Sequence, residues 1–392
     1  MYRKIKKIIF TISTLLLLFH FSNAQQKKRS QSKTPDHTIQ FIFTSDVHFG
    51  LNKENFRGQK NVPSYAVNAA MIAQVNRIPS MVFPADSGVN AGKKINFIDA
   101  IAITGDIANR EENGVQSDAV SWAQFLEDFG GLLQLKTSSG KRLPLLLTPG
   151  NHDASNAIGF HRPMRPLTDP SSVIGMYNLE MHPATKMTAP HFSFKRDKVH
   201  YSRNIAGVHF MFVSLWPDSA ERIWMAKDLA TLKKTVPVLL FTHSMPDVEA
   251  RFFVNPNGNH DINAKDKFEN LVTERFKDGD SINVRAVTEQ RGFANFLLAH
   301  PAIKAYFHGH NNYTEFYDWT GPDHAVLLHC FRADSPMKGK YSAKDESKLS
   351  FIVVSIDLVK KILTAREFFW NQNTLDKQHN AGWGSHISIS LQ

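Results

Sequence analysis

The stretch TIQFIFTSDVHF (residues 38–49) decides the fold, because an apolar run ends there in two side chains that carry chemistry. Such a run is typical of a strand that is buried on both faces of a sheet. On a regular strand, side chains two residues apart point to the same face, so Asp46 and His48 are expected to point the same way. The stretch therefore predicts a central strand with polar side chains at its carboxyl end.

Outward from this stretch, strand-like and helical segments alternate along the chain. Helical spacing recurs at 65–77, 118–133, 219–234 and 289–300, between apolar runs such as INFIDAIAITGD, LPLLLTPGNHD, VPVLLFTHS and IKAYFHGH. This alternation favours an α/β fold with helices outside packed sheets. No fixed repeat or Gly/Pro linker divides residues 38–392, so we expect one domain with long irregular insertions near 154–199 and 246–284.

Ligand-type side chains follow several of these apolar runs. They are Asp46, His48, Asp106, Asn151, His152, His243 and His310. In α/β sheets, ligands bind beyond the carboxyl ends of the strands, so these residues are expected to converge. Carboxylates, imidazoles and an amide oxygen suit ions such as Mn, Fe, Zn or Co, and the single Cys330 excludes a Cys-rich zinc site. Two ions need a bridging carboxylate, and Asp106 suits that role.

The order Asp-x-His, Gly-Asp, Gly-Asn-His-Asp, His and Gly-His, from about Ile39 to Asn312, resembles the calcineurin-like metallophosphoesterase superfamily. The resemblance implies two stacked mixed β-sheets flanked by helices, a four-layer sandwich. It also implies a dinuclear centre with two divalent or trivalent ions. The expected activity is hydrolysis of small phosphomonoesters or phosphodiesters.

The resemblance also implies roles for single residues. Asp46 and His48 would hold the first ion, Asp106 would bridge, and Asn151, His243 and His310 would hold the second. A hydroxide bridging the ions would attack phosphorus, with His152 as the general acid. Asn109 falls where some members carry a carboxylate that orients the catalytic His, and an amide can still orient His152 by hydrogen bonding. Arg110 falls where a phosphate-clamping Arg occurs.

The last motif departs from the Gly-His-x-His pattern, because the chain reads FHGHNN at 307–312. Keeping Gly309 in place makes His310 the first His and puts Asn312 where the second should stand. A shift by two instead makes His308 and His310 the pair. We favour the first register, since glycine allows the close backbone approach of a crowded metal turn. Asn312 would then offer the first ion an amide oxygen, a weaker ligand than imidazole.

The formal net charge of +10 is concentrated at the amino terminus. Residues 1–37 hold eight Lys and Arg against one Asp, a net of +7, which leaves +3 for the rest. Residues 1–24 combine a basic start, a short apolar run and small residues before Ala24, which predicts a signal peptide. Residues 25–37 resemble a disordered basic spacer. We therefore expect export to the periplasm or the extracellular space, no nucleic-acid binding, and no membrane span after cleavage.

Two other classes of function stay open from the sequence. Asn109 and Asn312 suit a catalytically weak or inactive relative that binds a phosphorylated or glycan ligand. The basic run from Lys27 to Lys33 suits a protein that binds an anionic surface. The enzyme is the leading hypothesis, because the ordered motifs account for more of the chain than either alternative does.

Overall fold

The computed structural model describes residues 38–109, 116–155, 169–193, 196–248, 287–372 and 382–392. Residues Thr38–Gln392 form one compact unit. The expected signal peptide and spacer, Arg110 and most of the second expected insertion lie outside the described residues. Within the described part of the chain, no helix is long and apolar enough to cross a membrane.

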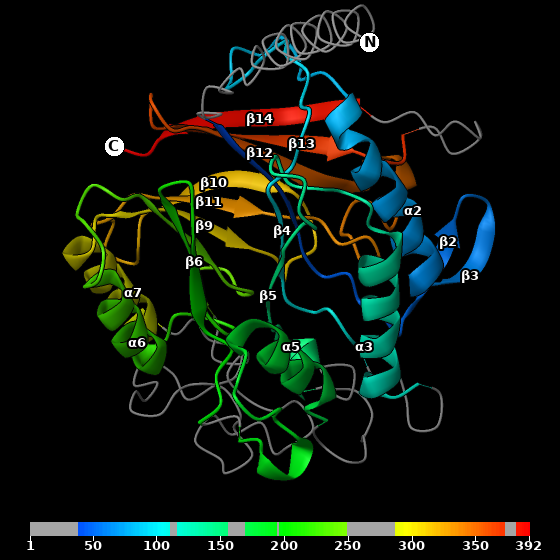
Figure 1. Ribbon diagram of the computed structural model, residues 1–392, viewed down its shortest axis with the longest axis horizontal. Helices are drawn as coiled ribbons and strands as arrows, with labels where there is room; N and C mark the ends of the chain where they lie inside the picture. The colour runs from blue at the N-terminus through cyan, green and yellow to red at the C-terminus, as the bar shows by residue number, and fades with distance from the viewer. Residues whose placement is uncertain (1–37, 110–115, 156–168, 194–195, 249–286, 373–381) are drawn as a thin grey trace, which may run out of the picture. The chain divides into compact units, whose positions relative to one another are not determined.

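Two six-stranded mixed sheets form the centre of this unit (Figure 1). The first has the order β14-β13-β12-β1-β4-β5, where β1 (Thr38–Thr44), β4 (Ala100–Thr104) and β5 (Leu145–Thr148) run parallel. It continues antiparallel through β12 (Ser350–Asp357), β13 (Ile362–Phe369) and β14 (Gly382–Ser390). A separate hairpin joins β2 (Asn52–Phe56) to β3 (Gln59–Pro63).

The second sheet has the order β10-β11-β9-β8-β7-β6. Its parallel strands are β7 (Val208–Phe212), β8 (Val238–Phe241), β9 (Ile303–His308) and β11 (Leu328–Arg332). The antiparallel edges are β6 (Tyr201–Ile205) and β10 (Glu315–Trp319). Each sheet thus contributes a set of parallel strands, and these strands end in the loops that carry the predicted site residues.

Aromatic side chains join the two sheets. Phe41 of β1 lies 5.9 Å from Phe241 and 5.6 Å from Phe307 between ring centroids, and Phe43 lies 5.1 Å from Phe307. All four rings are fully buried. Edge-to-face pairs at such distances add to the free energy of burial, so these Phe side chains fix β1 against β8 and β9.

Helices cover the outer faces, and the predicted fold class is confirmed. The helices are α2 (Ser64–Arg77), α3 (Asp118–Glu127), α4 (Asn151–Ser155), α5 (Ser171–Met181), α6 (Ser219–Leu229) and α7 (Val287–Ala299). Met71 of α2 and Phe125 of α3 belong to the core of the first sheet, whereas Met225 of α6 and Phe293 of α7 pack with the second. The layers are therefore helices, sheet, sheet and helices (Figure 1).

Three local details differ from the sequence-based expectations. Strand β1 ends at Thr44, so Asp46 and His48 lie in a loop and not on a regular strand. Helix α5 lies inside the expected irregular insertion at 154–199 and buries Val173 and Met176. Strands β10 and β14 were not predicted, because neither half-exposed edge sequence contains a continuous apolar run.

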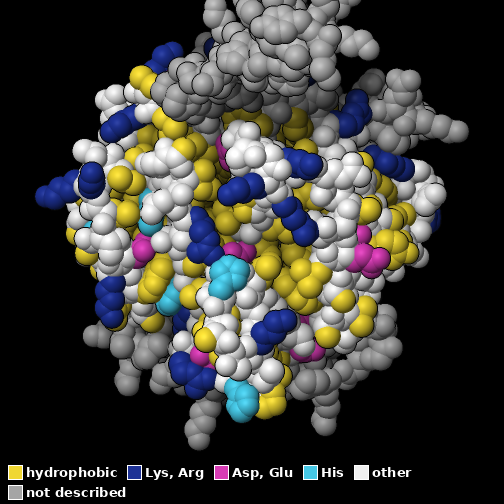
Figure 2. All heavy atoms as spheres, viewed as in Figure 1, with side chains coloured by type: hydrophobic (Ala, Val, Ile, Leu, Met, Phe, Trp, Pro, Cys, Tyr) yellow, Lys and Arg dark blue, Asp and Glu magenta, His cyan; other side chains and the backbone are white. Residues whose placement is uncertain are grey.

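Charged side chains are mixed on the surface. On the face drawn in Figure 2, Lys and Arg side chains are scattered among apolar, acidic and uncharged ones. The composition leaves a net charge of only +3 for residues 38–392. On this face, the mixture offers no single basic field to attract a polyanion over long range.

Glu180 of α5 gives the fold a testable pH dependence. Its buried carboxyl accepts the Leu147 N–H at 3.1 Å, and burial raises its pKa to about 7. The unfolded chain loses this proton near pH 4.5, so the free energy of unfolding should fall as pH rises from there to about 7. Glu180→Gln should remove up to roughly 3 kcal/mol of that fall. Urea titrations across this pH range measure it.

The matched control is Glu54→Gln, which changes an exposed carboxyl on β2. The free energy of unfolding of this variant should change with pH as it does in the unaltered protein. If the free energy of unfolding falls equally with pH in Glu180→Gln and in the unaltered protein, burial of Glu180 is not the cause of the fall.

Candidate metal centre

The loops that follow β1, β4, β8 and β9 are joined by hydrogen bonds. The Asp46 N–H donates to Gly105 O at 3.0 Å, which ties the turn after β1 to the turn after β4. The Gly309 N–H donates to His243 O at 3.0 Å, and the His310 N–H donates to Asp46 Oδ2 at 3.0 Å. Strand ends from both sheets therefore meet in one buried cluster, as the sequence predicted.

Several predicted ligands adopt left-handed backbone conformations. Positive φ angles occur at Asp46 (54°), His48 (46°), Asp106 (49°), His310 (68°) and Asn312 (57°). Non-glycine residues rarely adopt this region, and such strain collects at functional sites. The turns still direct Asp46 and His48 inward, since both side chains are fully buried. The shared direction expected for these two side chains therefore comes from two strained turns, and a regular strand is not needed for it.

A first group of donor atoms combines Asp46, His48 and Asp106. His48 Nε2 lies 3.8 Å from Asp46 Oδ1 and 3.8 Å from Asp106 Oδ2. Asp46 Oδ1 and His48 Nε2 are buried and have no hydrogen-bond partner among the described residues. Buried polar atoms without partners cost free energy, and a cation bound between these atoms would satisfy both. The first donor group therefore fits a metal ion.

A second group lies on the other side of Asp106. His243 Nε2 lies 3.4 Å from Asp106 Oδ1, 3.0 Å from Asn151 Oδ1 and 3.1 Å from His310 Nδ1. His243 Nδ1 donates to Thr104 O at 2.7 Å, so its Nε2 is the atom that faces the cluster. Nitrogen and oxygen donors at this spacing also fit a metal ion. Asp106 is shared by the two groups, one carboxylate oxygen to each.

Burial and charge set the protonation of the ligands. Burial lowers the pKa of His48 to about 3, which leaves the imidazole neutral, the form that binds metals. Burial raises the pKa of Asp46 to about 7. Burial opposes ionisation of Asp106 as well, but the neighbouring histidines, His243 first, hold its pKa well below the usual range. Asp106 is therefore the fixed negative charge of the cluster.

Asn109 links His48 to His152. Its Oδ1 lies 2.6 Å from His48 Nδ1, and its Nδ2 lies 2.5 Å from His152 Nδ1. When the His48 Nδ1–H donates to the amide oxygen, the amide N–H donates to His152 Nδ1, which places the His152 proton on Nε2. The structure thus brings Asn109 against His152, as expected, and adds a contact with His48 that the sequence did not suggest. Arg110 lies outside the described residues.

The last motif adopts the register that keeps Gly309 in place. A Cβ on Gly309 would overlap Ser45 and Asp46. His310 faces Asn151 Oδ1 at 3.0 Å, whereas His308 Nε2 turns away to the Tyr317 hydroxyl at 2.8 Å. The geometry therefore does not bring His308 to the donor groups.

Asn312 lies next to His310. Its Nδ2 donates to His310 O at 3.0 Å, and its Oδ1 is buried without a hydrogen-bond partner among the described residues. Its backbone oxygen accepts the Lys340 N–H at 2.6 Å, which fixes the turn. The amide oxygen of Asn312 is therefore available as a metal ligand, as the favoured register requires.

Sequence reasoning missed Lys338 and the role of Asp153. Lys338 Nζ lies 3.0 Å from His152 Nε2, although the loop after β11 carries none of the recognised motifs. Asp153 is 1% exposed and accepts backbone N–H groups of Ala108 (2.8 Å) and Gly150 (2.8 Å). It ties two motif turns together. The only available signal for Lys338 was that its loop follows an apolar strand.

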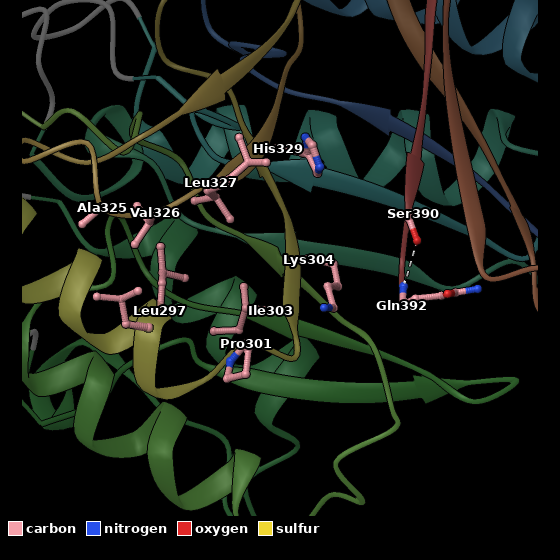
Figure 3. Close-up of a pocket in the computed structure, with 12 residues that line it drawn as sticks. Leu297, Pro301, Ile303, Lys304, Ala325, Val326, Leu327, His329, Ser390 and Gln392 are labelled. Atoms are coloured by element: carbon pink, nitrogen blue, oxygen red, sulfur yellow. Dashed lines mark hydrogen bonds between the residues drawn. The ribbon is translucent and has the colours of Figure 1, made fainter.

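A separate cavity of about 370 Å³ lies away from this cluster. It adjoins the start of β9 at Ile303, whereas His310 follows the end of that strand. Figure 3 shows its apolar wall, which includes Leu297, Val326 and Leu327. No predicted site residue is among its described lining residues.

Comparison with known proteins agrees with this geometry. The calcineurin-like phosphoesterase family model matches residues 39–312, from the first motif to the last. The chain belongs to the calcineurin-like phosphoesterase family. Members of this family are generally metal-dependent hydrolases of phosphoesters. This agrees with two sets of donor atoms around Asp106 that could hold a metal ion, one with His48 and His152 and one with Asp46 and His243. The predicted family is therefore confirmed. Comparison with curated protein sequences gave no match.

Solved structures with similarity to this family member include a dimetal phosphatase from Danio rerio, at 10% identity and a TM-score of 0.45, covering 90% of this chain and 99% of that one. A calcineurin-like phosphoesterase from Bacillus subtilis has 10% identity, coverage of 90% and 91%, and a TM-score of 0.33. A phosphopantetheinyl hydrolase from Mycobacterium tuberculosis has 11% identity, coverage of 76% and 91%, and a TM-score of 0.31. Likeness at this level says nothing of substrate.

Gly309→Ala tests the packing of the last motif. The added methyl group would overlap the Asp46 carboxylate and Ser45, so we expect metal affinity to fall by roughly tenfold or more, as for groups that hold a ligand in place. Equilibrium dialysis followed by metal analysis measures it. Gly131→Ala is the matched control, because nothing lies within 4 Å of a Cβ there. Unchanged affinity in the Gly309 variant would show that Asp46 does not depend on this approach.

Proposed function

We propose that this protein is an exported, metal-dependent hydrolase of small phosphomonoesters or phosphodiesters. The observation that carries the proposal is the sharing of Asp106 between two buried donor groups. Family membership supports phosphoester hydrolysis, and the amino-terminal sequence supports export. We assign the two groups to two divalent or trivalent ions, of Mn, Fe, Zn or Co.

The protein's own residues would hold the two ions and orient the proton donor. Asp46, His48 and Asp106 would hold one ion, and Asn151, His243 and His310 would hold the other with Asp106. Asn312 would add its amide oxygen to the first. Such ions supply Lewis acidity, which activates water and offsets the negative charge of the phosphoryl group.

His152 would deliver a proton to the leaving oxygen. Asn109 contacts His152 at Nδ1, so Nε2 is the ring nitrogen that would carry this proton to the substrate. The His152 backbone N–H donates to Asp106 Oδ1 at 2.8 Å, which fixes the residue beside the shared carboxylate. A proton donor positioned in this way contributes about 10²- to 10⁴-fold to rate.

Metal content and turnover test the proposal together. We expect protein reconstituted with Mn or Fe to bind about two ions per chain and to hydrolyse an aryl phosphate or a bis-aryl phosphate diester. Asp106→Asn should lower both bound metal and rate, the rate by at least about 100-fold, because even residues behind the ligands cost 10- to 100-fold. His329→Gln, on β11 beside Asp318, should change neither. Folded protein with neither metal nor turnover would refute the proposal.

The weak or inactive relative is the second candidate, because Asn312 replaces an imidazole. We expect Asn312→His to lower metal affinity and rate by roughly tenfold. Asn312 donates an N–H to His310 O and offers its buried Oδ1 to the ion, and an imidazole has no oxygen to offer in the same place. Metal titration and steady-state rates of the two proteins measure it. A large rise in both would favour a degraded site and the binding function.

A further inference from the structure

A second cavity, of about 450 Å³, has an acidic floor and aromatic walls. Its buried lining residues are Asp334, from the loop after β11, and Ser350 of β12. The half-buried Glu367 and Phe369 of β13 and the half-buried Tyr313 also line it. None of the predicted metal ligands is among its described lining residues. The cavity is therefore a place for a ligand other than the predicted ions.

Asp334 is a buried carboxyl without a hydrogen-bond partner. It is 3% exposed, and neither of its side-chain oxygens accepts a hydrogen bond from a described residue. The Ser342 hydroxyl, the Ser335 N–H and the Lys53 ammonium lie close enough to lower its pKa, but burial outweighs them and raises that pKa to about 8. Lys53 Nζ itself donates to Met337 O at 3.4 Å. A buried carboxyl in this state gains free energy from any donor that reaches it.

The hydroxyl groups beside Asp334 are used by another network. The Asp334 N–H donates to Thr314 Oγ1 at 3.2 Å, and Thr314 Oγ1 lies 2.9 Å from Ser350 Oγ. The Ser350 hydroxyl donates to Glu367 Oε1 at 2.9 Å, so the Thr314 hydroxyl is the donor in its contact with Ser350. Glu367 Oε2 accepts the Ser385 hydroxyl at 3.0 Å. These hydroxyls therefore have no proton left for the Asp334 carboxyl.

Charge in the cavity changes from the rim to the floor. The charged lining residues are Asp334, Lys344, Asp345, Lys348 and Glu367. Lys344, Asp345 and Lys348 are exposed, so solvent screens them. Deeper in the cavity, Asp334 and Glu367 are both acidic, and the charge of Glu367 adds to burial in raising the pKa of Asp334. The floor thus carries two carboxyls and no cation among its described lining residues.

Aromatic rings form the walls above these carboxyls. Tyr313 and Tyr341 meet edge-to-face with 5.5 Å between ring centroids, and Phe369 belongs to the same lining. The face of such a ring attracts cations. Arg332 and Lys340 already contact the Tyr313 ring in this way, at 3.7 Å and 4.5 Å from its centroid, and neither lines the cavity. The walls therefore suit the apolar body of an organic cation.

We propose that this cavity binds an organic molecule with a protonated primary amine, which donates hydrogen bonds to the Asp334 carboxylate while its apolar part packs against Tyr313, Tyr341 and Phe369. A primary ammonium has three donors, enough for both Asp334 oxygens, whereas a quaternary ammonium has none. An opposite charge at this distance favours the ionised carboxylate. The inference goes beyond phosphoester hydrolysis, because it gives the protein a second ligand of different chemistry.

The test compares two probes of the same shape, 2-phenylethylamine and the uncharged 2-phenylethanol, by calorimetry on the full chain reconstituted with Mn near neutral pH. We expect saturable binding of the amine. The alcohol should bind about tenfold more weakly or worse, because it cannot form a charged hydrogen-bonded pair with Asp334. Asp334→Asn should weaken amine binding by a similar factor, about tenfold or more, and leave metal content unchanged.

Two further variants separate the ligand site from effects on folding. Tyr341 is 55% exposed, so Tyr341→Ala should fold normally and weaken amine binding by about threefold through loss of a ring that faces the cation. Asp318→Asn is the matched control, because it removes an exposed carboxyl of β10 that does not line the cavity. Its amine affinity should equal that of the unaltered protein.

Four outcomes would overturn the inference. They are equal affinities for the amine and the alcohol, no saturable binding of the amine to folded unaltered protein, and unchanged amine affinity in either Asp334→Asn or Tyr341→Ala. Circular dichroism of each variant shows whether it is folded, and Tyr341→Ala decides if Asp334→Asn is not. Missing metal or turnover in the unaltered protein would count against the proposed function alone.

Discussion

The centre depends on one buried carboxylate. Asp106 is 3% exposed, and it lies between His48, which follows a strand of the first sheet, and His243, which follows a strand of the second. Gly150 has room for no side chain, because a Cβ there would overlap Asp106 Oδ1 and the Asp106 backbone. An isolated ionised carboxylate at this depth would be costly, so its charge needs the surrounding histidines or bound cations. The neighbouring turns place His48 and His243 next to this carboxylate.

Metal binding and folding are coupled in such an arrangement. Strained backbone at Asp46 and His48 and unpartnered donor atoms both raise the free energy of the metal-free protein. Phe41 packs edge-to-face against the stacked pair Phe241 and Phe307, which holds the strands rigidly enough to keep these turns in place. A bound ion would recover part of the strain and desolvation, so its binding free energy contributes to stability. The hydrophobic core therefore supports a site that is unfavourable by itself.

The sequence predicted what depends on local pattern. Apolar runs ending in Asp106, His243 and His310 identified strands, their polar ends and the family. The left-handed turns at Asp46 and His48 could not be predicted, because those conformations are imposed by contacts with the turn after β4. Lys338 could not be predicted either, since Ser335 positions it through a contact with Asp46, a residue nearly 300 positions earlier. Neither long-range contact leaves a local pattern.

The charge at the metal centre depends on which charged side chains are buried there, and the net charge of the whole chain does not determine it. Asp46, Asp106 and Lys338 together carry a net charge of −1 when ionised, and two divalent ions would change this to +3. That reversal occurs within a few ångströms and at low dielectric, where each charge acts far more strongly than on the surface. The +3 spread over residues 38–392 is weak by comparison. Attraction of an anionic phosphoester would therefore depend on filling the two donor groups, with Lys338 3.0 Å from His152 beside them.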